Sequence, residues 1–324
     1  MCISPERLTV SYRILVLEGL TERGQEILRA EGWTLDQMKA QPQEELLKLV
    51  PPYHAILVRS GSKMTPEVID AAKNLKVIGR AGVGVDNIDL AAATRRGVLV
   101  MNSPGGNTIS TAELAIALML ALARNNPPAD SSMKGENWDR KKYAGVELYG
   151  KRLGVVGLGR IGREVASRAR ACGMEVQAYD PFVSAAVAEE AHVKLRSLEE
   201  LLQTSDYLSL HTTLTDETRH LLNKETLSKV KPGVRIVNAA RGPLIDPDAL
   251  IDALDSGRVA GAGLDVHAKE PPQDWRLAHH PQVIATPHLG ASTKEAQQRV
   301  GTDIAQQVRD YLKGGIIQQA VNFY

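Results

Sequence analysis

Three glycines in the stretch LGVVGLGRIGREVASRARACGMEVQAYD, residues 153–180, constrain the fold of this chain more than any other feature. Gly157, Gly159 and Gly162 form a G-x-G-x-x-G pattern that follows an apolar run and opens a segment with helical spacing. The first glycine allows a tight strand-to-helix turn, the second lets a pyrophosphate approach the backbone, and the third lets the helix pack closely. The helix N-terminus then offers unpaired N–H groups to the phosphates. The pattern therefore predicts a dinucleotide-binding βαβ unit.

An acid stands at the end of the next apolar run, about 20 residues beyond the glycines. Asp180 there is placed to accept hydrogen bonds from a ribose diol and to repel a 2′-phosphate, which favours NAD over NADP. The alternative is a structural glycine turn with an aspartate that caps a strand. The succession of strand, helix, strand and acid favours the cofactor site.

Strand-like and helix-like segments alternate along the whole chain, which predicts an α/β protein with mostly parallel sheets. Helices are expected to begin near Thr21, Thr65 and Asp89 and to cover residues 108–124 and 293–313. The polar stretch 125–145 is expected to be irregular. Strands are expected at 13–18, 54–60, 76–82, 98–102, 152–157, 175–179, 206–210, 234–238, 261–266 and 282–286. The last helix follows the second series of strands, so it is free to return to the first domain.

Composition excludes several classes of protein. The chain has 324 residues, enough for about two domains. Its net charge of +1 predicts no strong electrostatic field that would attract nucleic acid or a membrane surface. Its two cysteines, Cys2 and Cys172, lack metal-ligand spacing and fit a reducing compartment. The start lacks the apolar core of a secretory signal. The apolar segment 108–124 is shorter than the roughly 20 residues of a membrane span, so we expect a cytoplasmic protein without a metal.

Three polar residues follow expected strands of the second series, where ligands of parallel sheets bind. Arg241 offers a planar fork for a carboxylate, and His288 titrates near neutrality and can exchange a proton. Glu270 would orient that imidazole and raise its pKa. Together they predict oxidation of a 2-hydroxy acid, in which His288 takes the hydroxyl proton as hydride leaves for a nicotinamide. Considered one at a time, Arg241 could be a cation at the protein surface, Glu270 a solvated acid in a loop, and His288 a structural histidine in a turn.

Several blocks of the chain resemble the D-isomer-specific 2-hydroxyacid dehydrogenase family. The blocks are GLGRIGREVA, NAARGPLID, GLDVHAKEPP and TPHLGASTKEAQ. GRAGVGVDNIDL, MNSPGGNTISTAEL and NWDRKKYAGVEL narrow the resemblance to members that act on a phosphorylated 2-hydroxy acid. The similarity runs from residue 13 to residue 322. It implies two Rossmann-like, doubly wound parallel-sheet domains with an interdomain cleft: a discontinuous substrate-binding domain, 1–104 plus 291–324, and an NAD-binding domain, 105–290.

The resemblance also implies roles for individual residues. Arg241, Glu270 and His288 match the catalytic set, and NAD is the implied cofactor. The expected cofactor-binding residues are Gly157, Gly159, Arg160, Ile161, Gly162, Asp180, His211, Thr212, Ala239, Ala240, Asp265 and Gly290. Family members dimerise through their cofactor domains, so we expect a homodimer or higher homo-oligomer with the helix at 108–124 in its interface. Longer members carry C-terminal regulatory domains, and such regulation is not expected for a chain that ends in VNFY.

A substrate charged at both ends needs a second cationic cluster, and the first domain offers candidates after its strands. Arg59 and Arg80 are the expected cations, although solvated surface charges are the commoner case. Backbone amides of the following turn would bind a carboxylate. The resemblance implies that a dimer partner can lend a basic residue of the segment 138–142, here Arg140 or Lys141. The full set of expected substrate-binding residues is Arg59, Ser60, Arg80, Gly82, Val83, Gly84, Asn102, Arg140 and Lys141. Some members have a polar residue where this chain has Val83.

Two other functions remain open from the sequence. One is a related reductase that acts on glyoxylate or hydroxypyruvate. The other belongs to a different class, an NADH-sensing corepressor-like binding protein with the same fold and catalytic set. Turnover of a phosphorylated acid would separate both from the first interpretation.

Overall fold

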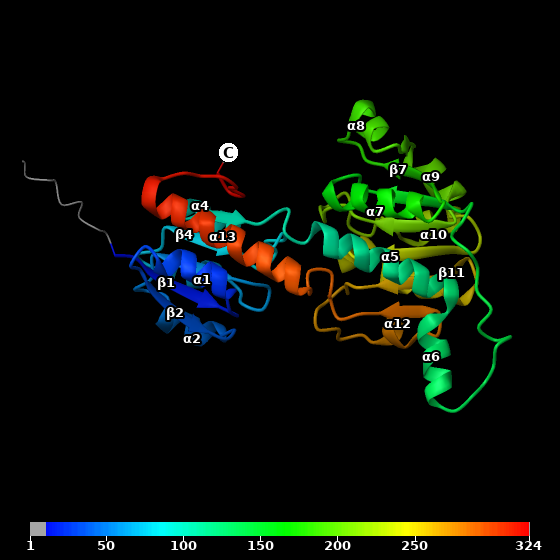
Figure 1. Cartoon of the computed structure of the whole chain (residues 1–324), viewed down its shortest axis with the longest axis horizontal. Helices are drawn as coiled ribbons and strands as arrows, with labels where there is room; N and C mark the ends of the chain where they lie inside the picture. The colour runs from blue at the N-terminus through cyan, green and yellow to red at the C-terminus, as the bar shows by residue number, and fades with distance from the viewer. Residues whose placement is uncertain (1–10, 324) are drawn as a thin grey trace, which may run out of the picture. The chain divides into compact units, whose positions relative to one another are not determined.

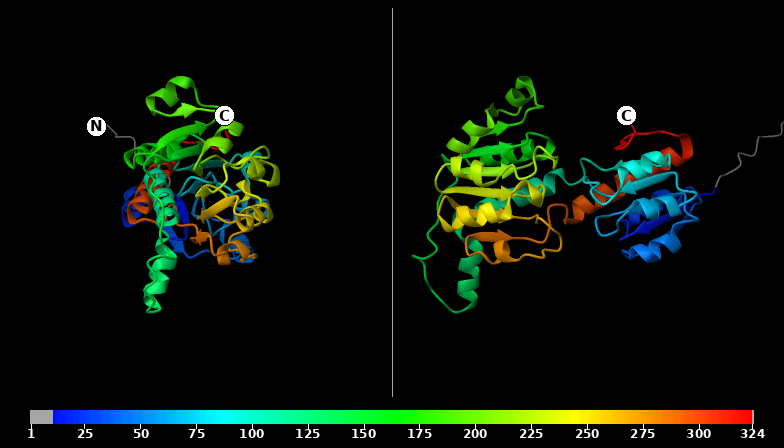
Figure 2. Two further views of the ribbon diagram at one scale, coloured as in Figure 1. Left: turned by 90° about the vertical axis from the view of Figure 1, so that its right-hand side faces the viewer. Right: turned by 180° about the vertical axis from the view of Figure 1, so that it is seen from behind.

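The computed structural model describes residues 11–323, so Cys2 lies outside the described residues. The chain divides into two compact units. The first holds residues 11–107 and 294–323, and the second holds residues 108–293. Each unit contains one parallel sheet with helices on both faces (Figures 1 and 2), which confirms the predicted fold class of two doubly wound α/β domains.

Five parallel strands form the sheet of the first unit. They are β1 (Arg13–Leu17), β2 (Thr34–Met38), β3 (Ala55–Val58), β4 (Val77–Arg80) and β5 (Leu99–Asn102), in the order β2-β1-β3-β4-β5. The direction in which strands are added reverses between β1 and β3, and such a switch point is where doubly wound sheets bind ligands. The edge strand β2 was not predicted, because TLDQM carries little of the apolar, β-branched pattern of a strand.

Helices cover both faces of this sheet. On one face, α1 (Glu22–Arg29) and α13 (Lys294–Gly314) pack on one core, in which Val300, Ile304 and Val308 of α13 meet strand residues. The last helix therefore belongs to the first unit. The other face carries α2 (Gln43–Leu49), α3 (Pro66–Ala71) and α4 (Leu90–Arg95). The helix starts predicted near Thr21, Thr65 and Asp89 are confirmed, because each of these side chains caps its helix.

Seven parallel strands form the sheet of the second unit. They are β6 (Arg152–Val156), β7 (Glu175–Tyr179), β8 (Lys194–Leu195), β9 (Tyr207–Leu210), β10 (Val234–Asn238), β11 (Val259–Leu264) and β12 (Val283–Ala285). Their order is β12-β11-β10-β9-β6-β7-β8, so the switch point lies between β6 and β9. The predicted glycine turn directly follows β6, at that point.

Helices again cover both faces. α5 (Thr108–Arg124) and α7 (Arg160–Ala171) share one core. The core on the other face is shared by three helices, α9 (Leu198–Thr204), α10 (Lys224–Lys229) and α11 (Pro247–Asp255). Three short helices lie in connections: α8 (Ala185–Glu190), η1 (Gly242–Leu244) and α12 (Arg276–His279). The predicted span of α5 is confirmed, and its inner face is buried. Within residues 11–323, every helix is too short or too polar to cross a membrane.

The prediction of an irregular stretch at 125–145 is wrong for its first part. Residues Asn126–Lys134 form α6, which projects from the unit beyond the end of α5 (Figure 1). Asn125 adopts a left-handed conformation, φ 52°, and separates the two helices. Prolines follow in the first turn, where a missing N–H does no harm. None of the residues of α6 is buried, so no apolar periodicity marked this helix in the sequence.

Candidate active site

The glycine turn has the shape that a dinucleotide requires. Gly157 has φ 91°, and a Cβ there would lie 2.7 Å from the amide nitrogen of Thr212. A Cβ on Gly162 would lie 2.1 Å from the carbonyl oxygen of Gly157. By contrast, the space around the missing Cβ of Gly159 is open to 4 Å. Gly157 and Gly162 thus permit close packing. Gly159 leaves room for a pyrophosphate to approach the first turn of α7, which begins with Arg160 and Ile161.

Asp180 lies directly after β7 and is held beside this turn. Its Oδ2 accepts a hydrogen bond from the amide of Leu158 at 2.8 Å, and its Oδ1 accepts one from the amide of Phe182 at 2.9 Å. Each carboxylate oxygen keeps a further lone pair for a ribose hydroxyl. The turn, the helix N-terminus and the acid together fit NAD.

His211 follows β9 on the other side of the switch point. Its Nε2 lies 2.7 Å from the hydroxyl of Ser209, and its Nδ1 is buried without a hydrogen-bond partner among the described residues. Burial lowers the pKa of His211 to about 4, so the ring is neutral near pH 7. A neutral ring at this position borders the glycine turn and carries no charge for proton chemistry.

The end of β10 positions Arg241. Asn238 is buried, its Nδ2 donates to the carbonyl of Arg241 at 2.9 Å, and its Oδ1 accepts from the amide of Ala240 at 3.1 Å. This side chain closes a turn that contains Ala239 and Ala240. A Cβ on Gly242 would lie 2.0 Å from the carbonyl of His267, so the Arg241 turn packs directly against the segment that leads to Glu270.

His288 and Glu270 form a hydrogen-bonded pair. Nδ1 of His288 lies 2.6 Å from Oε2 of Glu270, with 45% and 37% of the two side chains exposed. The other oxygen, Oε1, accepts from the amide of His267 at 3.1 Å. Glu270 thus fixes the imidazole and leaves Nε2 as the nitrogen that can exchange a proton with a ligand.

Electrostatics tune this pair toward acid–base chemistry. The hydrogen bond to Glu270 raises the pKa of His288, against burial and against the positive charge of Arg241. Burial opposes the charged form of Glu270, but hydrogen bonds from His288 and His267, with the charges of those rings, keep its pKa below the usual range. Arg241 and the pair of His288 and Glu270 all belong to the second unit.

A buried aspartate supports the turn that carries His288. The carboxylate of Asp265 accepts hydrogen bonds from the hydroxyl of Thr286 at 2.6 Å and from the amides of Leu289 and Gly290 at 2.7 and 2.8 Å. His288 itself has φ 55°, a region that non-glycine residues rarely occupy, and its amide donates to the carbonyl of Asp265 at 2.8 Å. From the sequence, Asp265 was expected only to bind the cofactor, and its support of the turn that carries His288 was not predicted.

Gly290 is fixed from a second direction. Its carbonyl accepts hydrogen bonds from the hydroxyls of Ser110 and Thr111, at 2.8 and 3.0 Å. The first turn of α5 therefore braces the segment that follows His288.

The expected substrate-binding residues of the first unit follow neighbouring strands. Arg59 comes directly after β3, and Arg80 ends β4. A Cβ on Gly82 would lie 1.4 Å from Nη1 of Arg80, so glycine at this position leaves room for the guanidinium. Nδ2 of Asn102 donates to the carbonyl of Val83 at 2.6 Å, so this amide holds the turn formed by residues 82–84. Ser60 is exposed on the loop after β3.

Arg140 and Lys141 belong to the other unit. Both are exposed on the segment between α6 and β6, in the second unit. Their role as residues lent by a partner stays a prediction. Among residues 11–323, no group of three or more His, Cys, Asp or Glu side chains is arranged to hold a metal ion.

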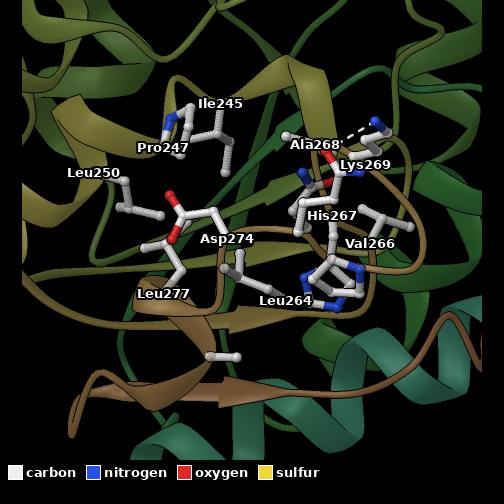
Figure 3. A pocket seen from close by; sticks show the side chains of 15 residues that line it. Ile245, Pro247, Leu250, Leu264, Val266, His267, Ala268, Lys269, Asp274 and Leu277 are labelled. Atoms are coloured by element: carbon white, nitrogen blue, oxygen red, sulfur yellow. Dashed lines mark hydrogen bonds between the residues drawn. The ribbon is translucent and has the colours of Figure 1, made fainter.

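A pocket of about 250 Å³ lies between η1, α11, α12 and the segment after β11 (Figure 3). Its walls are apolar, with Leu250, Leu264 and Leu277 among them, and Lys269 and Asp274 add charged side chains to the lining. Of the described residues that line it, none is Arg241, Glu270 or His288. This pocket is therefore separate from the acid–base pair.

Comparison with known proteins agrees with this geometry. Residues 116–290 match the family model described as D-isomer specific 2-hydroxyacid dehydrogenase, NAD binding domain. D-3-phosphoglycerate dehydrogenase of Archaeoglobus fulgidus is 52% identical over 311 residues, which cover 96% of this chain and 59% of that protein. The Bacillus subtilis protein of the same name is 48% identical over 312 residues, with the same two coverages. The chain therefore spans about three fifths of the length of these relatives.

A solved structure shows the likeness in three dimensions over nearly the whole chain. The crystal structure of a glyoxylate reductase from Paecilomyes thermophila superposes with a TM-score of 0.88 at 33% identity, covering 96% of this chain and 98% of that one. The match of the family model to residues 116–290 makes the second unit an NAD-binding domain. By this match and by these relatives, the chain belongs to the D-isomer specific 2-hydroxyacid dehydrogenase family.

Proposed function

We propose that this chain is an NAD-dependent D-3-phosphoglycerate dehydrogenase. It would oxidise 3-phosphoglycerate to 3-phosphohydroxypyruvate, the first step of serine biosynthesis. The observation that carries the proposal is the hydrogen-bonded pair of His288 and Glu270 in an NAD-binding domain, in which Arg241 also follows a strand of the sheet. The relatives named for this activity support the choice of substrate.

Each member of the catalytic set has one task. Arg241 clamps the substrate carboxylate through its planar fork. Nε2 of His288 takes the proton of the 2-hydroxyl group, while Glu270 holds Nδ1–H and stabilises the imidazolium that forms. NAD, when bound, supplies the acceptor for the hydride that leaves C2. In the reverse direction the imidazolium returns the proton to the carbonyl oxygen.

Residues around the switch point of the second unit would hold the cofactor. The glycine turn and the start of α7 would bind the pyrophosphate, and Asp180 would bind the ribose hydroxyls. The other residues assigned to NAD are Arg160, Ile161, His211, Thr212, Ala239, Ala240, Asp265 and Gly290.

The first unit would bind the rest of the substrate. Arg59 and Arg80 supply positive charge for the phosphate, and the amides of the turn at 82–84 suit a carboxylate. Asn102 would act through this turn, since its amide is bonded to Val83.

A second candidate is a reductase of glyoxylate or hydroxypyruvate. The structural likeness to a glyoxylate reductase favours it, because the acid–base pair alone does not select a phosphorylated substrate. A panel assay of NADH formation separates the two, with 3-phosphoglycerate compared with lactate, glycerate and 2-hydroxyglutarate. The proposal expects a clear preference for 3-phosphoglycerate. Equal turnover of glycerate would contradict it, and tight NADH binding without any turnover would favour a corepressor.

We also propose that the protein is a cytoplasmic homodimer. Ile109 and Leu120 on α5 expose 37% and 40% of their surface, and α6 adds Met133 at 53%. These exposed apolar side chains support an interface along α5 and α6. Light scattering of the purified protein should give twice the mass of one chain, and a monomer at all concentrations would contradict the proposal.

A further inference from the structure

The loop after β3 is held by side chains from two other parts of the first unit. Oε2 of Glu18 accepts a hydrogen bond from the amide of Gly61 at 2.8 Å, and Oε1 accepts one from the amide of Ser62 at 2.7 Å. Nδ2 of Asn87 donates to the carbonyls of Arg59 and Ser62, at 2.7 and 2.6 Å. Four backbone groups of residues 59–62 are thus fixed by two side chains.

This bracing occurs at the switch point of the five-stranded sheet. Glu18 directly follows β1, and Arg59 directly follows β3, the two strands between which the order reverses. Ligands of doubly wound sheets bind beyond the strand ends at this point. Glu18 also has φ 69°, and such a conformation of a non-glycine residue persists only where its surroundings hold it. The strained residue is therefore placed where a ligand is expected.

An acid at this point opposes the charge of the proposed ligand. A carboxylate near Arg59 repels a phosphate by Coulomb's law, and it would partly offset the attraction of the guanidinium. Both oxygens of Glu18 accept hydrogen bonds from backbone amides. Glu18 therefore contributes by fixing the geometry of this loop, and its charge does not attract the ligand. The same bonds occupy the amides of Gly61 and Ser62, which leaves the Arg59 side chain and the exposed Ser60 as the parts of this loop that can meet a ligand.

We propose that Glu18 and Asn87 are positioning residues, which set the backbone of the Arg59–Ser62 loop so that Arg59 meets the phosphate of the substrate. The inference rests on the proposed function. Neither side chain touches the substrate in this scheme. Their effect is preorganisation: a loop fixed before binding loses less conformational freedom when the ligand arrives.

The substitution Glu18→Gln separates geometry from charge. Glutamine has the same shape, but its NH₂ group cannot accept a hydrogen bond, so one of the two amides loses its partner. Positioning predicts that KM for 3-phosphoglycerate rises roughly tenfold, while kcat and KM for NAD stay unchanged. A role through charge alone predicts the opposite sign, because removal of an acid would lower KM for an anion. A lowered or unchanged KM would overturn the proposal.

Matched variants make the result specific. Glu45→Gln removes one acid from an exposed pair with Lys48 in the same unit and should leave KM unchanged. Asn87→Ala removes both donors to the loop and should raise KM for 3-phosphoglycerate as Glu18→Gln does. Should either variant fold poorly, as judged by its melting temperature, the other still tests the proposal.

Hydrogen exchange tests the bracing without any substrate. The amides of Gly61 and Ser62 should exchange faster in Glu18→Gln than in the wild type, with exchange in β1 and β3 unchanged. If the wild type does not turn over 3-phosphoglycerate, the proposed function fails while this measurement still reports on the loop. If the wild type is active and exchange rises but KM does not, the positioning role is wrong.

Discussion

Glu270 bonds to Nδ1 of His288 at 2.6 Å, and this contact leaves Nε2 of the imidazole for the substrate. The two residues are separated along the chain and come from the connections after β11 and β12, which neighbour each other in the sheet. The pair predicts how the reaction depends on pH. The proposed oxidation needs neutral His288, so kcat/KM for oxidation should rise with pH through the pKa of His288, which Glu270 holds above the usual range near 6.5.

Glu270→Gln should move this limb to lower pH. The amide oxygen can still accept from Nδ1–H, but the negative charge that favours the imidazolium is lost, so the pKa of His288 falls. The measurement is the pH profile of kcat/KM for NADH formation. Glu190→Gln, an exposed acid on α8, is the matched control and should leave the profile unchanged. A limb that stays in place in Glu270→Gln would show that Glu270 does not act on His288.

Replacement of Arg241 should damage substrate binding more than cofactor binding. Arg241→Lys keeps the charge but loses the planar fork that holds a carboxylate by two hydrogen bonds. We expect kcat/KM for 3-phosphoglycerate to fall by about 10–100-fold, since hydrogen bonds to charged groups are lost, while Kd for NADH stays unchanged. Arg219→Lys, at an exposed position, serves as the control. An equal loss of NADH affinity would contradict a carboxylate clamp.

Two glycines of the cofactor turn should respond differently to alanine. Gly162→Ala would place a Cβ 2.1 Å from a backbone oxygen, and overpacking of this kind costs about 1–3 kcal/mol of unfolding free energy. The Cβ that Gly159→Ala introduces would lie in open space, and the φ of −71° at this position suits alanine. The free energy of unfolding should therefore not change. Because that space is where the pyrophosphate would lie, NAD affinity should fall. Denaturant titration and calorimetric binding check the pair. Unchanged NAD binding in Gly159→Ala would place the phosphates elsewhere.

His211 should make the protein less stable in mild acid. Its pKa is lowered to about 4 in the folded state, so below pH 6.5 the unfolded chain binds a proton that the folded chain rejects. The stability is therefore complete above pH 6.5 and is lost as the pH falls toward 4, by at most about 3 kcal/mol. Urea titrations of the wild type and of His211→Gln between these pH values measure the difference. Parallel pH dependence in the two proteins would contradict a buried neutral ring.

The sequence predicted the elements and residues whose signal is local. The glycine turn, Asp180 and the three catalytic candidates follow strands that read clearly as apolar runs. The strand β2, the two-residue strand β8 and the helix α6 are polar or exposed, and they carry no periodic signal. Their existence depends on neighbours in space.

The support of the site could not be predicted in the same way. Asn238, Asp265, Asn87 and Glu18 hold turns through side-chain contacts to the backbone. Such contacts depend on which strand ends meet, and a single residue in the sequence gives no sign of its partner. Asn102 shows the same limit, because a residue expected to bind substrate is bonded to the carbonyl of Val83.

The most direct test of the catalytic proposal compares the wild type with His288→Asn in the formation of NADH from 3-phosphoglycerate. General base catalysis contributes about 10²–10⁴-fold, so kcat should fall by that factor while NADH still binds with wild-type affinity. A variant that keeps its rate to within about tenfold of the wild type would contradict proton transfer by His288.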